Sequence, residues 1–253
     1  MTTTLDQLDS RVLRRVDCYG QRFMKPGEYR YTLCPAGVGD VVDDAPFVVE
    51  VTADEDAKGP DDATREDRRI GQATVVVRHD GRRFVAEPAH VRVRVGDMVL
   101  WNGPDDRPFT VRGAKEFFAS DRLLNESGYS HVFTVPGEFA WGDAYGSELH
   151  GTVRVAMPEV GSAKALDAWR ARLASGHAVV VADGRAEPAE VDVVVGQTVF
   201  FVVTNGPGVS ITDTALLDEK GRPGTKDDDK DDGKHDDKDD GKGRHQGYEK
   251  GHA

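Results

Sequence analysis

The sequence of 253 residues is poor in cysteine and in long apolar runs, and each shortage excludes a class of protein. Two cysteines, Cys18 and Cys34, are too few for a disulfide scaffold. The apolar runs are only a few residues long, so no segment is expected to span a bilayer. The first residues, Met1 to Asp6, lack the basic start and apolar stretch of a signal peptide. These shortages predict a cytoplasmic protein in a reducing compartment.

Basic charge is also in short supply. The chain has 33 Lys and Arg against 45 Asp and Glu, which gives a net charge of −12. Duplex DNA and anionic membrane surfaces repel such a chain, so we expect neither nucleic acid nor membrane as a partner. The length suits one large or two small domains with a sizeable core.

Sequence motifs of enzymes are missing as well. The sequence contains no G-x-S-x-G, H-E-x-x-H or C-x-x-C motif. Its glycine pairs fit turns and do not form a phosphate-binding loop before a helix. We therefore predict no catalytic and no cofactor-binding residue, and we expect that the protein is not an enzyme.

Apolar and polar residues alternate with a period of two through much of the chain. In residues 88–101, Val91 and Val93 alternate with Arg92 and Arg94, which places the valines on one sheet face and the arginines on the other. Turn signals recur about every ten residues, as they do in sandwiches of short strands. The pattern predicts an all-β protein made of two Greek-key β-sandwiches.

One helix interrupts the β pattern. Leu166, Trp169 and Leu173 fall on one stripe of a helix, with Ser162 as the N-cap and Gly176 as the C-cap. The segment 158–176 is therefore predicted to be a helical connector.

Two polar segments are predicted to lie outside the sandwiches. Residues 53–72 are interrupted by Gly and Pro, which is typical of a linker. Residues 218–253 carry 12 acidic residues and 9 Lys or Arg, in Lys/Asp/Gly repeats. This composition cannot bury enough apolar surface to offset the entropy lost on ordering, so we expect a disordered acidic C-terminal tail.

Two internal repeats indicate how the sandwiches are built. Residues 86–104 resemble residues 186–207 at a shift of 100 and then 103, and residues 10–31 resemble residues 120–141 at a shift of 110. The identical pairs of the second repeat are Ser10 and Ser120, Leu13 and Leu123, Tyr19 and Tyr129, Phe23 and Phe133, Pro26 and Pro136, Gly27 and Gly137, and Glu28 and Glu138. The alternative is chance similarity among short valine-rich strands.

The order of the repeats is half, whole, half. Each half alone would leave an apolar sheet face and an unpaired edge. We therefore predict that residues 10–52 and 177–217 pair into one split, circularly permuted domain, and that residues 73–157 form a second domain inserted between them. Pairing within one chain is favoured over a domain-swapped oligomer, because the tether gives each half a high effective concentration for the other.

The central unit resembles a cupredoxin, the β-sandwich family of plastocyanin and pseudoazurin. The resemblance rests on residues 84–103, with a Gly-Asp turn followed by Met-Val-Leu-Trp-Asn, on residues 108–111, and on residues 136–155, which open with Pro-Gly-Glu-Phe. It covers residues 73–157 and, in split form, most of the chain before the tail. In the family it implies a type 1 copper site of two imidazoles, a thiolate and a weak axial thioether.

The residues at the ligand positions of this family are not copper ligands of that kind. The resemblance places Phe109 at the first imidazole, Asp143 at the thiolate, Gly146 at the second imidazole and Leu149 at the thioether. In the split unit Cys34 stands one place late, with no histidine behind it. We therefore predict that the type 1 copper site is lost. Cys34 is interpreted as either a small core residue or a reactive thiol, and a bond between Cys18 and Cys34 stays open.

Other residues suggest a different metal site. His90, His150 and Asp143 would give two nitrogens and one oxygen for zinc, nickel or copper(II). The alternative is that both histidines are exposed strand ends. In the tail, His235, His245 and His252 would capture transition metal ions, whereas a solubilising spacer is the alternative there.

The sequence predicts a non-enzymatic cupredoxin-like scaffold that needs no cofactor and that binds a protein partner or associates with itself. This prediction rests on analogy at the level of the fold. The alternative is a metal-handling protein that binds copper, zinc or nickel through the histidines and aspartates named above.

Overall fold

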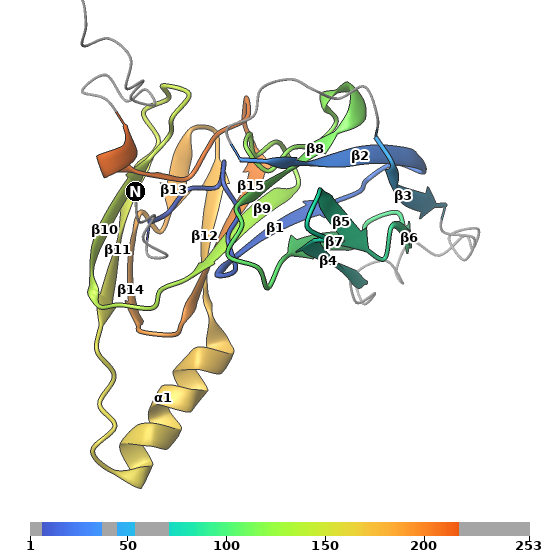
Figure 1. Cartoon of the computed structure of the whole chain (residues 1–253). Helices are drawn as coiled ribbons and strands as arrows, with labels where there is room; N and C mark the ends of the chain where they lie inside the picture. The colour runs from blue at the N-terminus through green and yellow to red at the C-terminus, as the bar shows by residue number, and fades with distance from the viewer. Residues whose placement is uncertain (1–6, 37–44, 54–70, 218–253) are drawn as a thin grey trace, which may run out of the picture.

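The computed structural model describes residues 7–36, 45–53 and 71–217. These residues form β-strands in three sheets and a single α-helix, which confirms the predicted all-β class (Figure 1). The predicted tail, residues 218–253, and nearly all of the predicted linker, residues 53–72, lie outside the described residues.

Eight strands from the first half of the chain form the first sandwich. They are β1 (Asp17–Arg22), β2 (Gly27–Pro35), β3 (Phe47–Thr52), β4 (Gln72–His79), β5 (Phe84–Glu87), β6 (His90–Arg94), β7 (Met98–Asn102) and β8 (Phe109–Gly113), followed by the 3-10 helix η3 (Ala114–Glu116). Strands β1, β7, β4 and β5 form one layer, and β8, β2, β3 and β6 form the other. In β6, Val91 and Val93 are buried while Arg92 and Arg94 are exposed, as the alternation predicts.

The second half of the chain repeats this arrangement. Its elements are β9 (Ser127–Val132), β10 (Gly137–Gly142), β11 (His150–Ala156), α1 (Ala163–Ser175), β12 (His177–Ala182), β13 (Arg185–Glu187), β14 (Glu190–Val194), β15 (Thr198–Asn205), β16 (Thr212–Asp213) and the 3-10 helix η4 (Thr214–Leu216). Strands β9, β15, β12 and β13 form one layer, and β16, β10, β11 and β14 form the other.

The strand pairings correct the predicted division into a split and an inserted domain. Strand β2 pairs with β3 and β8, and β1 pairs with β7, so residues 10–52 close with residues 72–113. Strand β14 pairs with β11 and β15 pairs with β9, so residues 177–213 close with residues 127–156. Both repeats are present as predicted, but each half takes the partner that is nearer along the chain. The shorter connection costs less loop-closure entropy.

The two sandwiches share one sheet of eight strands, in the order β13-β12-β15-β9-β1-β7-β4-β5. Strands β1 and β9 are antiparallel at its centre, and Tyr19 is paired with Tyr129. These two tyrosines are equivalent in the 110-residue repeat. A pseudo-two-fold axis therefore passes between Tyr19 and Tyr129, and it relates β1 to β9, β7 to β15, β4 to β12 and β5 to β13.

The second layers of the two sandwiches are linked by equivalent hydrogen bonds. The backbone N of Ser10 donates to Ile211 O at 2.9 Å, and Ile211 N donates to Ser10 Oγ at 3.0 Å. Ser120 N donates to Val111 O at 2.9 Å, and Val111 N donates to Ser120 Oγ at 3.1 Å. In each sandwich, the residues before the first strand thus form hydrogen bonds with the last strand, or the residue before it, in the other sandwich.

The helix α1 confirms the helix predicted within residues 158–176. Ser162 Oγ accepts a hydrogen bond from Ala165 N at 3.2 Å, and Gly176 ends the helix with a φ of 56°. Figure 1 shows α1 extending away from the sheets. It is held at one side, where Trp169 Nε1 donates to Val195 O at 3.0 Å.

Candidate functional site

The four positions aligned with the cupredoxin ligands do not lie in one sandwich. Phe109 begins β8 in the first sandwich, whereas Asp143, Gly146 and Leu149 follow β10 in the second. Val209 takes the place of Phe109 in the second sandwich. Phe109 forms a backbone bridge with Leu13, and Val209 forms the equivalent bridge with Leu123. Of these side chains, the Asp143 carboxylate alone offers ligand atoms.

The Asp143 carboxylate is buried and already accepts four hydrogen bonds. Oδ1 accepts from Ser210 N at 2.8 Å, from Ser210 Oγ at 3.1 Å and from Tyr145 N at 3.1 Å. Oδ2 accepts from Ser147 N at 3.2 Å. A carboxylate saturated in this way fixes the loop between β10 and β11 against residue 210. Its role is structural.

The structure does not bring the predicted metal ligands together. His90 begins β6 in the first sandwich, where its Nε2 lies 3.0 Å from Glu50 Oε2. His150 begins β11 in the second sandwich, and its Nδ1 lies 2.8 Å from Glu148 O. Within residues 7–36, 45–53 and 71–217, no group of three or more His, Cys, Asp or Glu is placed to hold a metal ion. His235, His245 and His252 lie outside these residues.

Both cysteines are free thiols. Cys34 is buried on β2, and burial raises the pKa of its thiol. Cys18 lies on β1, where burial and the nearby Asp17 carboxylate raise the pKa of its thiol to about 12. A reactive cysteine needs the opposite shift, because the thiolate is the nucleophile.

The central feature of the surface is an apolar groove of about 180 Å³ on the eight-stranded sheet. The groove crosses β7, β1, β9 and β15 on the side turned away from the two smaller sheets, a side that we call the outer face. Its floor consists of Cys18, Gly20, Gly128 and Ser130, and its walls include Met98, Leu100, Phe200 and Val202. Phe200 is 45% exposed. The groove therefore lies across the junction of the two sandwiches.

Small residues make this groove possible. A Cβ atom on Gly20 would lie 2.9 Å from Leu100 Cδ2, so the absence of a side chain lets Leu100 lean over β1. A Cβ atom on Gly128 would lie 3.1 Å from Phe201 O. Gly128 is the equivalent of Cys18 in the 110-residue repeat, and Gly20 is the equivalent of Ser130. All four floor positions are occupied by small residues.

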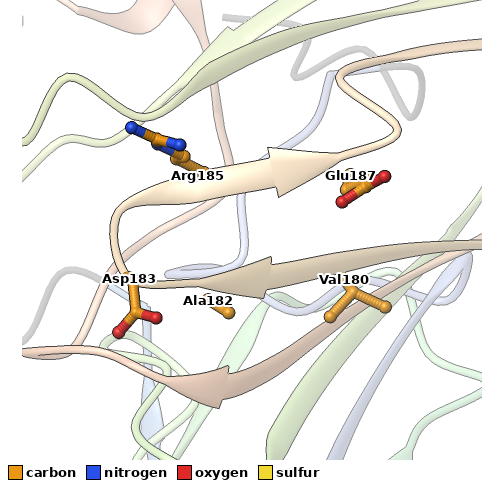
Figure 2. A pocket seen from close by; sticks show the side chains of 5 residues that line it. All are labelled: Val180, Ala182, Asp183, Arg185 and Glu187. Carbon is orange, nitrogen blue, oxygen red and sulfur yellow. The ribbon is translucent and has the colours of Figure 1, made fainter.

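A wider hollow of about 530 Å³ lies at the edge of the same sheet, on the β12–β13 hairpin. Figure 2 shows Glu187 opposite Val180 on the paired strands, with Asp183 and Arg185 at the turn end. Val180 is 42% exposed and is the register partner of Val202 in the groove. The outer face thus runs from an apolar centre to an edge that carries charges of both signs.

A polar cluster is buried beneath the junction. Asp17 Oδ1 accepts a hydrogen bond from Tyr129 OH at 2.7 Å and lies 2.7 Å from His131 Nδ1. Asp17 Oδ2 accepts from Arg14 N at 2.8 Å. The Asp17 and His131 side chains are 0% exposed, and His131 Nε2 has no hydrogen-bond partner among the described residues. Burial, followed by the charge of Asp17, raises the pKa of Tyr129 well above its ordinary value, so this hydroxyl stays a donor.

The pseudo-two-fold axis places a neutral set of residues opposite this cluster. Gln21 and Ser127 are paired across β1 and β9, as His131 and Asp17 are. Tyr19 OH donates to Gln21 Oε1 at 3.1 Å, and Gln21 Nε2 donates to Arg22 O at 2.9 Å. Because the buried cluster has no exposed side chain, it serves the junction and offers no access to a substrate.

Sequence reasoning did not find the groove or the buried cluster. Both depend on the pairing of β1 with β9, which the predicted split domain did not contain. The signal was present in the 110-residue repeat, where Asp17 aligns with Ser127 and Gln21 aligns with His131. An exchange of polar types at equivalent buried positions of β1 and β9 marks the place where the two units diverged.

No helix in the described part of the chain is long and apolar enough to cross a membrane. The chain matches no family model, no curated protein and no solved structure.

Proposed function

We propose that this protein is a non-enzymatic binding or assembly scaffold made of two cupredoxin-like units without a type 1 copper site, and that the outer face is its binding surface. The apolar groove across the junction carries the proposal. Charged residues make up 31% of the chain, yet the groove is lined by apolar side chains on one exposed sheet face. These side chains are Met98, Leu100, Phe200 and Val202. Exposed apolar surface that is rimmed by polar residues is typical of interaction sites.

The chemistry of the groove supports binding and not catalysis. Its charged side chains, Arg22 and Glu126, form an ion pair with each other at 3.2 Å. Its thiol, Cys18, has a pKa of about 12 and is not a nucleophile near neutral pH. What remains is a neutral, apolar hollow built on a rigid sheet, which suits an apolar side chain of a partner.

A photo-cross-linking experiment tests the proposal. Phe200 is replaced by benzoylphenylalanine, which keeps an aromatic ring at the position, and the chain is irradiated in an extract of its source. Phe117 is the matched control, because it is 59% exposed and packs near Tyr29 on the opposite layer. We expect cross-linked species at position 200 and none at position 117. Equal labelling at both positions, or none at position 200, would contradict the proposal.

A further inference from the structure

We infer that the edge strand β6 of one chain pairs with the edge strand β14 of a second copy, so that copies join head to tail. The inference goes beyond the proposed function, because it concerns the edges of the two smaller sheets and not the outer face. It rests on the open backbone groups of the two strands, on their opposite charges and on the register in which they match.

Strand β6 has one open side. It ends the sheet β6-β3-β2-β8, and in the described part of the chain β3 is its only strand neighbour. Val48 N on β3 donates to Ala89 O at 3.0 Å. Backbone groups alternate in direction along a strand, so the N–H and C=O groups of His90 and Arg92 point away from β3.

Strand β14 is open in the same way. It ends the sheet β14-β11-β10-β16, and Thr152 N on β11 donates to Ala189 O at 2.8 Å. The backbone groups of Glu190 and Asp192 therefore point away from β11. Open edge groups of this kind are what an added strand from another chain pairs with.

The turns after the two strands set the length of each open edge. Arg94 N donates to Asp97 Oδ2 at 2.9 Å, and Val194 N donates to Gln197 Oε1 at 3.2 Å. The backbone N of Asp97 and of Gln197 donate back to the carbonyls of Arg94 and Val194. The outward groups of Arg94 and Val194 are thus already paired, and the two residues before each of them along the outward series stay open.

The exposed side chains of the two edges have opposite charges. Strand β6 presents His90, Arg92 and Arg94, whereas its equivalent in the repeat, β14, presents Glu190 and Asp192. Two β6 edges would place arginine against arginine, and two β14 edges would place carboxylate against carboxylate, which prevents pairing. The unlike pairing alone is attractive, so the charges select β6 against β14.

One antiparallel register satisfies both edges. With Arg92 opposite Glu190 and His90 opposite Asp192, the residues of each pair exchange their open N–H and C=O groups. Each pair also joins a basic side chain to an acidic one. The valine between the two pairs meets the equivalent valine of the partner, on the face that is buried in each sandwich. The alternation of charged and apolar residues therefore continues from one chain into the next.

The neighbouring strands extend the charge pattern. Glu50 Oε2 lies 3.0 Å from Arg92 Nη2, and Arg154 Nη1 lies 2.9 Å from Glu190 Oε2. The contact thus places Glu50, Arg92, Glu190 and Arg154 in a row of alternating sign, and such networks contribute more than isolated surface pairs. The described residues carry 20 Lys and Arg against 22 Asp and Glu, so little of the net charge of −12 lies in the sheets that meet.

The contact is heterologous, because it joins two different strands. A copy that is bound through β6 keeps its β14 edge open, so further copies can add. About four backbone hydrogen bonds and two pairs of opposite charge make a weak contact. Growth is therefore expected at high protein concentration.

Sedimentation velocity on the purified full chain, from about 1 to about 500 µM, tests the inference, because association is linked to concentration. We expect species larger than two chains to appear as the concentration rises. Arg92→Glu and Glu190→Arg each place like charges across the contact, and each is expected to weaken association at least about tenfold. The chain that carries both substitutions has opposite charges again, so it should associate more strongly than either single variant.

Arg30→Glu is the matched control. It breaks an exposed ion pair with Glu28, as Arg92→Glu does with Glu50, but Arg30 lies on β2, which is not an edge strand. Circular dichroism verifies that each variant is folded. A wild-type chain that stays monomeric or stops at two chains overturns the inference, as does an equal effect of Arg30→Glu. A double variant no stronger than the single ones also overturns it. Cross-linking at position 200 does not involve these edges, so the two tests fail separately.

Discussion

The first and second sandwiches have the same framework, yet they meet through two different polar pairs. On one side of the pseudo-two-fold axis the buried side chains of Asp17 and His131 contact each other. On the other side the neutral register partners Ser127 and Gln21 each donate to a backbone carbonyl, Ser127 to Leu124 O and Gln21 to Arg22 O. The apolar positions around them are shared. The comparison teaches that the duplicated units diverged where side chains from both meet, and that His131 Nε2 is left without a partner among the described residues on the ionisable side.

A second difference between the sandwiches lies in their cores. In the first, Tyr31 meets Trp101 with ring centroids 5.5 Å apart at 79°. In the second, Trp141 meets Phe201 at 5.2 Å and 78°. The tryptophan lies on the shared sheet in the first sandwich, as Trp101, and on the opposite layer in the second, as Trp141. Both pairs keep an edge-to-face geometry. Cores tolerate such exchanges when the total volume is conserved.

The largest effect is expected from removal of residues 1–52. The deletion takes β1, β2 and β3 from the first sandwich, so β7 loses β1 in one layer, and β6 and β8 lose their sheet neighbours β3 and β2 in the other. We expect residues 71–113 to become sensitive to protease, while residues 177–205 stay protected by β9 and β11. Limited proteolysis with mass spectrometry measures both. Protection of 71–113 together with loss of 177–205 would restore the split domain that the sequence repeats suggest.

The junction is expected to respond next. Asp17→Ser leaves His131 and Tyr129 without their acceptor, and breaking a buried pair costs about 3–5 kcal/mol of unfolding free energy. Adding His131→Gln copies the neutral pair of the opposite side, so the double variant should lose clearly less than the sum of the two single variants. Urea unfolding of the four chains measures the coupling. Additive losses would show that the two side chains act independently.

The core exchange predicts a smaller effect. Trp101→Phe leaves a cavity and Tyr31→Trp overfills its site, and each is expected to cost about 1–3 kcal/mol. Together they place the aromatic pair of the second sandwich in the first. The double variant should return to within about 1.5 kcal/mol of the wild type, as volume-conserving exchanges do. Thermal unfolding tests this, and a double variant less stable than either single variant would refute the equivalence of the two cores.

A reactivity measurement perturbs the fold least. In a Cys34→Ser chain, Cys18 is the only thiol. Its pKa is raised from 9.0 to about 12, so the thiolate that reacts with iodoacetamide is roughly a thousandfold scarcer near pH 8 than in the urea-unfolded chain. The native rate should rise about tenfold with each pH unit between pH 7 and 9. A native rate equal to the unfolded rate would place Cys18 in open solvent.

Much of the fold was predictable because it is encoded locally. The alternation of Val91 and Val93 with Arg92 and Arg94 places β6, and the caps Ser162 and Gly176 delimit α1. The repeats also correctly identify equivalent positions. The repeats do not show which of two equivalent segments pairs with β1 to β3, because the segment with β6 to β8 and the segment with β14 to β16 resemble each other. That choice depends on the length of the connections, which similarity between segments does not measure.

The candidate site was less predictable for a related reason. Alignment with the cupredoxin ligands combines Phe109 of one sandwich with Asp143 of the other. The aligned positions therefore do not form a single site. Gly20 and Cys18 carry no signal of their own as a binding surface. They become the floor of a groove only when β1 lies beside β9 and Leu100 leans over Gly20.

The central claim is that β1 and β9 join the two sandwiches into one sheet, and an engineered disulfide tests it most directly. Cys18 is the register partner of Ser130, and directly paired strand residues lie within the Cα separation that a disulfide needs. Oxidation of a Ser130→Cys, Cys34→Ser chain at low concentration should give an intrachain disulfide. Thr204→Cys in the same background is the control, because β15 lies two strands from β1, about 10 Å away. Intrachain closure in the Ser130→Cys chain alone is the predicted result, measured at equilibrium in a thiol–disulfide buffer because the raised pKa of Cys18 slows its reaction. Failure of that chain to close at equilibrium would contradict the shared sheet.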